Sequence, residues 1–280
     1  MEALDEVLQR AFRHADDGEW DAAAELLREQ LEEYEDAPEI HCWLGVAERE
    51  LGMQGIAYER FKRALALDPQ DPHVLATAGN ALSHFADPDA ESALRAAALT
   101  APDYAMGRML YGAYLSREGF VEDALDELTA ARELDRDDPQ IAYELGVALQ
   151  LDEKPEAAAA AVGEAVALDR RDPWIRAVFG LLLLEVDRWE EAAGELSEAA
   201  RLAPHDVEVQ AVASLAASAV GDEGLAFEMM ERARMRGREG DQALLQAVED
   251  RLAQGSEAAD RLLRENLAPD MLRRRLAERP

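Results

Sequence analysis

The sequence predicts an all-α array of about seven helix-turn-helix repeats. Three observations carry this prediction. Small residues return at a nearly constant period of 34 residues, large apolar residues return at the same period, and prolines fall between repeats or in the turns within them. A period of this length, kept over many units, is typical of a solenoid in which each repeat packs on its neighbours.

The period can be followed position by position. One position always holds alanine, with a single step of 33 residues and all other steps of 34: Ala23, Ala57, Ala90, Ala124, Ala158, Ala192, Ala226. A second is small in every repeat: Ala11, Gly45, Gly79, Gly112, Gly146, Gly180, Ser214. A third is large and apolar: Leu27, Phe61, Leu94, Leu128, Val162, Leu196, Met230. The alternative, an alanine-rich helical bundle, would not keep one register over seven units.

The first repeat, residues 4–37, opens on a helix with apolar residues at helical spacing. Asp16 to Glu19 form the turn, and a second helix is expected from Trp20 to Tyr34. Since the first unit covers one end of the stack, its acidic surface suits a polar cap.

The next six repeats are expected at residues 38–71, 72–104, 105–138, 139–172, 173–206 and 207–236. The single short step falls in the turn that contains Asp87 and Pro88, where a connection can absorb a deletion. Pro139 and Pro173 each follow an aspartate. That order predicts an acidic N-cap with proline in the first helical turn.

The C-terminal part departs from the period. Glycines and arginines between residues 234 and 240 indicate a break. Helices are then expected from Asp241 to Gln254 and from Ser256 to Leu267, as a degenerate eighth repeat. A capping helix is expected from Pro269 to Glu278. The predicted domains are therefore a solenoid over residues 1–237 and a C-terminal segment over 238–280.

The segment from Pro38 to Asp71 resembles the tetratricopeptide repeat, a helix-turn-helix of 34 residues. The resemblance rests on small residues at Gly45, Ala57 and Ala64, on Leu44 and Phe61, and on the closing pair Asp68 and Pro69. It implies a right-handed solenoid whose first helices line a concave groove. It also implies that peptides or helices bind in that groove.

The same resemblance places the groove at positions two, five, nine and twelve of each repeat, where this chain is mostly apolar. The residues expected to contact a partner are Cys42, Val46, Asn80, Met106, Met109, Tyr143, Val147, Trp174 and Leu181. We therefore expect a scaffold or adaptor that binds an apolar or amphipathic segment of a protein. Only Asn80 matches the basic and amide residues with which relatives clamp a C-terminal carboxylate. Two alternatives stay open: neighbouring helices bury some of these residues, or the chain's own C-terminal helices fill the groove.

The net charge of -31 is unevenly distributed. Residues 1–227 hold 49 acidic and 18 basic side chains, whereas residues 228–280 hold 11 of each. The acidic N-terminal part has no basic surface patch that could bind phosphate groups, so a nucleic acid is not expected as the ligand. The acidity favours a basic protein partner or serves only solubility. The alternative function is an assembly-factor subunit that acts through its acidic convex face or its arginine-rich C-terminal end.

The sequence contains no pattern for catalysis, cofactor binding or metal binding. An enzyme is therefore not predicted, and no cofactor is expected. Cys42 is the single cysteine, which excludes an internal disulfide. No apolar run is long enough to span a membrane, and the acidic start does not resemble a secretory signal. A cytoplasmic location is expected, while the oligomeric state stays open.

Overall fold

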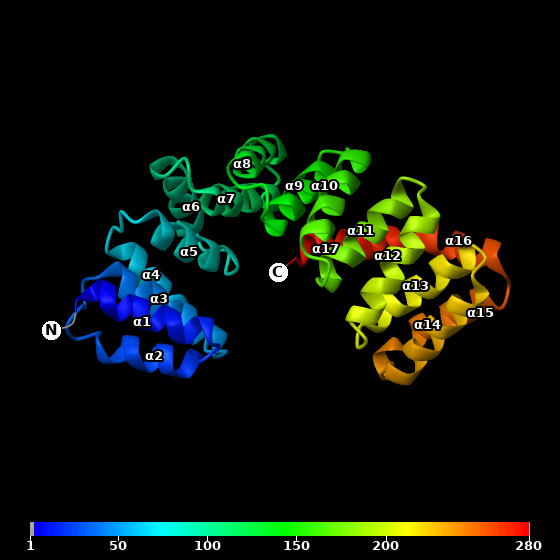
Figure 1. Ribbon diagram of the computed structural model, residues 1–280, viewed down its shortest axis with the longest axis horizontal. Coiled ribbons are helices and arrows are strands. Elements are labelled where there is room, and N and C mark those ends of the chain that lie inside the picture. Colours follow the sequence, from blue (N-terminus) through cyan, green and yellow to red (C-terminus); the bar gives the residue numbers. More distant parts are fainter. Residues whose placement is uncertain (1–2, 280) are drawn as a thin grey trace. The chain divides into compact units, whose positions relative to one another are not determined.

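Helices joined by short turns make up the computed structural model, which describes residues 3–279 and shows no strand within them (Figure 1). The helices up to the seventh repeat are α1 (Leu4–Asp16), α2 (Trp20–Glu29), α3 (Pro38–Glu50), α4 (Gln54–Ala66), α5 (Pro72–Ser83), α6 (Asp89–Thr100), α7 (Ala105–Arg117), α8 (Val121–Leu134), α9 (Pro139–Leu151), α10 (Pro155–Leu168), α11 (Pro173–Glu185), α12 (Trp189–Leu202), α13 (Val207–Ala219) and α14 (Glu223–Arg236). The most extensive contacts join α3 with α4, α5 with α6, α9 with α10, α11 with α12, and α13 with α14. The all-α solenoid predicted from the sequence is confirmed.

The small positions allow the two helices of a pair to approach each other. A Cβ built on Gly146 would lie 2.4 Å from Cγ2 of Val162, and one on Gly180 would lie 2.7 Å from Cγ of Leu196. Val162 and Leu196 occupy the large apolar position of the second helix. The two recurring positions of the sequence therefore meet across each of these pairs, because glycine leaves room for the facing side chain.

The first repeat differs from the prediction. The second helix was expected to reach Tyr34, but α2 ends at Glu29 and residues 30–36 form turns. Gln30 stands at a position that holds buried alanine in later repeats, as at Ala64. A long polar side chain cannot pack there as alanine does, so the helix stops and Gln30 becomes its C-cap.

After α14, the chain forms a 3₁₀ turn, then α15 (Gln242–Leu252), α16 (Ser256–Leu262), a π-helical segment (Leu263–Leu267) and α17 (Ala268–Ala277). These helices lie close to the predicted bounds. Pro269 was expected to begin the last helix, and α17 begins one residue earlier with Pro269 in its first turn. Proline is tolerated there because the first N–H groups of a helix have no partner within the helix.

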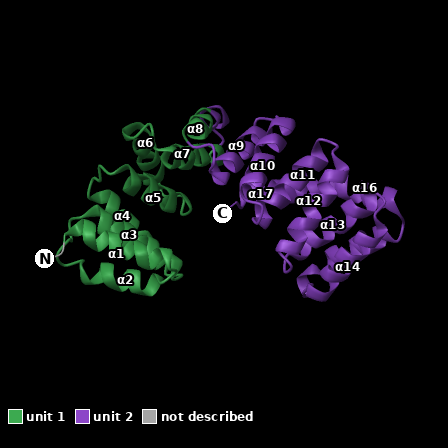
Figure 2. Cartoon of the chain, viewed as in Figure 1, with its two compact units in different colours: residues 1–118, 126–134 green, residues 119–125, 135–280 purple. Residues whose placement is uncertain are grey.

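The described residues divide into two compact units (Figure 2). Of the described residues, the N-terminal unit comprises 3–118 and 126–134, and the C-terminal unit comprises 119–125 and 135–279. The expected domain boundary at residue 237 lies inside the C-terminal unit and stays a prediction. Residues 1, 2 and 280 of the expected domains lie outside the described part of the chain.

The C-terminal unit has one continuous apolar core. It runs from Ala142 in α9 through the buried residues of α11 and α13 to Met271 and Leu276 in α17. The C-terminal helices therefore share a core with the fifth, sixth and seventh repeats.

Candidate partner-binding faces

The first helices of the repeats carry all nine residues expected to bind a partner. They are α3, α5 and α7 in the N-terminal unit, and α9 and α11 in the C-terminal unit. The two units place their predicted residues in different surroundings.

In the N-terminal unit, two of the predicted residues are buried. Cys42 is fully enclosed, and its thiol lies 3.9 Å from the carbonyl oxygen of Val74. Burial, followed by the charge of Asp71, raises the pKa of this thiol far above its usual value. Met109 is 6% exposed. Both side chains pack inside the unit, and the neutral Cys42 thiol is a small apolar residue there.

The other three predicted residues of this unit reach the surface. Met106 is 37% exposed. Val46 and Asn80 are half-buried, and Val46 packs against the core beneath it. They belong to α3, α5 and α7, the first helices of three consecutive repeats, and α5 packs against both α3 and α7. We call Val46, Asn80 and Met106 the open row.

Two polar side chains outside the nine predicted residues lie beside the open row. Arg117 in α7 donates a hydrogen bond to the Ser83 hydroxyl in α5 at 3.1 Å, and Ser83 donates to the backbone oxygen of Asn80 at 2.7 Å. Ser83 occupies a groove position of its repeat, but Arg117 lies one residue beyond one. The spacing rule therefore did not select Arg117.

In the C-terminal unit, the predicted residues are covered. Tyr143, Val147 and Leu181 are each at most 1% exposed. The Trp174 indole donates a hydrogen bond to the Tyr143 hydroxyl at 3.0 Å. Burial raises the pKa of Tyr143 well above its ordinary value, so the phenol stays protonated.

The cover is α17, which packs directly on α11 (Figure 1). The guanidinium of Arg275 lies 4.4 Å from the ring centroid of Trp174 and forms an ion pair with Asp206. Arg274 pairs with Glu208. The sequence left open whether the C-terminal helices occupy this face, and in the structure they do.

Arg279 is a contact that the sequence analysis missed. Its guanidinium lies 2.9 Å from Glu144 in α9, and both residues are almost completely buried. No helical spacing indicated it, because Arg279 lies beyond the end of α17 at Ala277.

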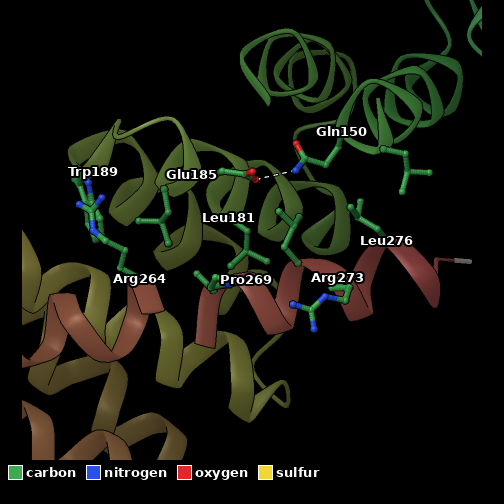
Figure 3. Close-up of a pocket in the computed structure, with 12 residues that line it drawn as sticks. Gln150, Leu181, Glu185, Trp189, Arg264, Pro269, Arg273 and Leu276 are labelled. Carbon is green, nitrogen blue, oxygen red and sulfur yellow. Dashed lines mark hydrogen bonds between the residues drawn. The ribbon is translucent and has the colours of Figure 1, made fainter. Parts of the chain in front are cut away.

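A cavity of about 440 Å³ lies beside α17 (Figure 3). Its apolar wall includes Leu181 and Leu184 from α11, and Leu272 and Leu276 from α17. Gln150 donates to Glu185 at 2.9 Å along one edge. At another edge, the Arg264 guanidinium lies 4.5 Å from the Trp189 ring centroid. The terminal helix therefore covers this face without filling it.

Within residues 3–279, no group of histidine, cysteine, aspartate and glutamate side chains is arranged to hold a metal ion. None of the helices in this range combines the length and the apolar character needed to cross a bilayer.

Comparisons with known proteins identify the fold only. No family model matches the sequence, and no curated protein matches it. Among solved structures, the APC/C heterotetramer Cut9–Hcn1 superposes with a TM-score of 0.68 at 17% identity. That match covers 85% of this chain and 48% of the other, so the chain spans about half the length of that relative.

Two further structures resemble this chain over most of their own length. PilF of Pseudomonas aeruginosa has a TM-score of 0.63 at 18% identity, covering 77% of this chain and 98% of that one. YrrB, described as a tetratricopeptide-repeat protein with an unusual peptide-binding site, has a TM-score of 0.54 at 20% identity. The match covers 68% of this chain and 97% of the YrrB chain. With its packed helix pairs and 34-residue register, this chain has the fold of the tetratricopeptide-repeat proteins.

Proposed function

We propose that this chain is a non-enzymatic protein-interaction scaffold that binds a peptide or amphipathic helical segment along its first helices. The observation that carries the proposal is the open row. Val46, Asn80 and Met106 come from three consecutive repeats and reach the surface, whereas Trp174 and Leu181 in the C-terminal unit are contacted by or face α17 residues.

The side chains of the open row suit an extended or helical segment. The Asn80 amide can donate to and accept from a partner backbone. Met106 is flexible and polarisable, so it can adapt to different apolar side chains. Arg117 and Ser83 supply polar groups at the edge. The likeness to YrrB supports this proposal only at the level of the fold.

We also propose that the partner segment is basic as well as apolar, and that the protein acts in the cytoplasm. Acidic residues outnumber basic ones by 49 to 18 over residues 1–227, which favours association with a positively charged segment. Association should therefore slow as salt is added, because salt screens the attraction.

Substitution of the open row tests the proposal. Asn80→Ala combined with Met106→Ala should remove most partner binding from a native extract, measured by quantitative mass spectrometry of co-purified proteins. Leu99→Ala is the matched control, because Leu99 is 70% exposed and lies on α6, a second helix. It should retain the same partners as the wild-type chain. Circular dichroism should show equal helicity in all three proteins.

Retention of every partner by the Asn80 and Met106 variant would contradict the proposal. It would favour the rival function, an assembly subunit that acts through its acidic outer surface or its arginine-rich end.

A further inference from the structure

We propose that the face of α11 on which α17 packs is a receptor for an amphipathic helix with the pattern Leu-x-x-Arg-Leu-x-x-Arg. In this proposal α17 is the resident ligand, and a partner helix of the same pattern displaces it. The inference goes beyond the proposed function, because it concerns a different face and names the chemistry of its partner.

The pattern is read from the buried side of α17. Leu272, Arg275, Leu276 and Arg279 are each 6–8% exposed. The first three lie on one face of α17 at the spacing i, i+3 and i+4, and Arg279 follows just beyond the end of the helix. Arg273, between them, has a side chain that is 76% exposed, pairs with Asp270 within α17 and lines the cavity beside the helix. Which arginines are buried therefore depends on their position along the chain, because arginines at other positions of the same segment stay exposed.

Each member of the pattern has a matching group on the receptor. Leu272 and Leu276 line the same cavity as Leu181 and Leu184 of α11, and Figure 3 labels Leu276 and Leu181 among them. Leucines at this spacing are the usual anchors of a helix bound in a groove.

The two arginines have their own sites. Arg275 combines a cation–π contact on Trp174 with an ion pair to Asp206. Arg279 donates through Nε to both oxygens of Glu144, at 3.1 and 2.9 Å. A guanidinium matches a carboxylate and an aromatic face in a way that lysine does not, so these contacts specify arginine.

Three features indicate that α17 can leave this face. The cavity beside it shows that the helix does not fill the space between its own leucines and α11. The ion pairs of Arg275 and Arg279 add little to the hold on α17, because their attraction is largely offset by the cost of removing both charges from water. The segment Leu263–Leu267 immediately before α17 is π-helical, an irregularity that occurs often at functional sites.

The rival explanation is a fixed cap. Met271 is 1% exposed and belongs to the core of the C-terminal unit. A fixed cap would be a permanent part of the fold and would not exchange with a second helix.

A labelled synthetic peptide of residues 266–279 tests the two explanations on the full chain. Its affinity is measured by fluorescence anisotropy for wild type and for the double variant Arg275→Ala with Arg279→Ala. The variant loosens α17 while every receptor side chain is retained. We expect it to bind the peptide about tenfold or more tightly than wild type, because binding to wild type must first release α17. Arg201→Ala is the matched control and should behave as wild type, because Arg201 is 56% exposed and pairs with Glu198 within α12, away from the cavity.

A second measurement needs no substitution. Saturating peptide added to the wild-type chain should accelerate amide hydrogen exchange in residues 268–277, as α17 is displaced. A scrambled peptide of the same composition should leave that exchange unchanged. Unchanged exchange with either peptide, together with no peptide uptake by the double variant, would overturn the proposal and establish α17 as a fixed cap. Neither outcome depends on Asn80 or Met106, so the test is independent of the proposed function.

Discussion

The small position of each repeat shows how single residues set the packing of a pair. Gly146 and Gly194 both lie inside helices, but their surroundings are opposite. A Cβ on Gly146 would meet Val162 and the Ala158 carbonyl oxygen, whereas one on Gly194 would meet nothing within 4 Å. Gly146 is required because Val162 fills the space that a side chain would occupy. Gly194 has no such constraint, and it only adds to the conformational entropy lost on folding.

The first prediction compares these two glycines. Gly146→Ala should lower the free energy of unfolding by about 1–3 kcal/mol, because the new methyl group overpacks the contact with Val162. Gly194→Ala, at an exposed site in α12, should raise it by up to about 1 kcal/mol, as expected from helix propensity. Urea denaturation followed by circular dichroism measures both. A stabilising effect at Gly146 would show that α9 and α10 separate easily.

The short turn of the third repeat depends on Asp87. Its carboxylate accepts hydrogen bonds from the Tyr58 hydroxyl at 2.7 Å, from Lys62 at 3.0 Å and from the Asp89 backbone at 2.9 Å. Burial acts to raise the pKa of Asp87, but these hydrogen bonds outweigh it and the pKa is lowered. The ionised carboxylate therefore stabilises the folded chain.

The second prediction follows from the lowered pKa of Asp87. Asp87→Asn should lower the free energy of unfolding at pH 7 by about 1–3 kcal/mol, since a hydrogen-bonded charge is lost. The difference in unfolding free energy between wild type and variant should be fully present above about pH 4, the usual pKa range of aspartate. It should disappear as the pH falls through the lowered pKa of Asp87 in the folded chain. Asp36→Asn is the control, because Asp36 is 91% exposed and its pairing with Arg63 should contribute about 0–1 kcal/mol. A gap that does not change with pH would mean that the Asp87 charge is unimportant.

At the scale of the element, aspartate caps decide where several first helices begin. Asp138 accepts from the backbone N–H of Gln140 and Ile141, and Asp172 accepts from those of Trp174 and Ile175. Each is followed by proline. The helix starts predicted from these two pairs of residues are confirmed, because the cap is a local interaction.

The third prediction concerns the cap of α11. Asp172→Ala should lower the free energy of unfolding by about 0.5–2 kcal/mol, with the loss concentrated in α11. Asp172→Asn keeps an acceptor oxygen and should remain close to wild type. Hydrogen exchange at Trp174 and Ile175 should rise in the alanine variant only. Equal exchange in both variants would show that the side-chain acceptor does not hold this end of the helix.

At the scale of the whole molecule, charge is the dominant feature. A net charge of -31 repels itself in the folded state, and the ion pairs found within the described residues neutralise it only locally. The fold must therefore be held by its apolar core against a general electrostatic repulsion.

The fourth prediction is a rise in stability with salt. Raising the ionic strength from about 0.01 to 0.15 M shortens the Debye length from about 30 to 8 Å and screens the repulsion. The midpoint of thermal unfolding should increase by about 2–4 °C, equivalent to about 1 kcal/mol for a chain of this size. Sodium and potassium chloride should act equally if screening is the cause. A falling midpoint would mean that local ion pairs outweigh the net charge.

Much of the fold was predictable because its information is local or periodic. Glycine and alanine returned in register with Phe61 and its equivalents, and the structure places those positions in contact. The prediction failed where one residue broke the register, at Gln30, since spacing alone does not say how a helix responds to a side chain that it cannot pack.

The candidate faces were less predictable. The spacing rule selected nine positions, but it could not distinguish the buried Cys42 from the exposed Met106, because both belong to the same row. Burial depends on what the neighbouring helices contribute, and no single repeat contains that information.

The sequence by itself determined the repeat, its register, the capped helix starts and the acidic character of the chain, because these follow from residues close together or equally spaced. Only the tertiary structure decided that α17 packs on α11 beside Trp174 and Leu181. The contacts responsible join residues 69 and 135 positions apart, Arg275 with Asp206 and Arg279 with Glu144. Such distant pairs have no periodic signature, and they become neighbours only when the helices between them have packed.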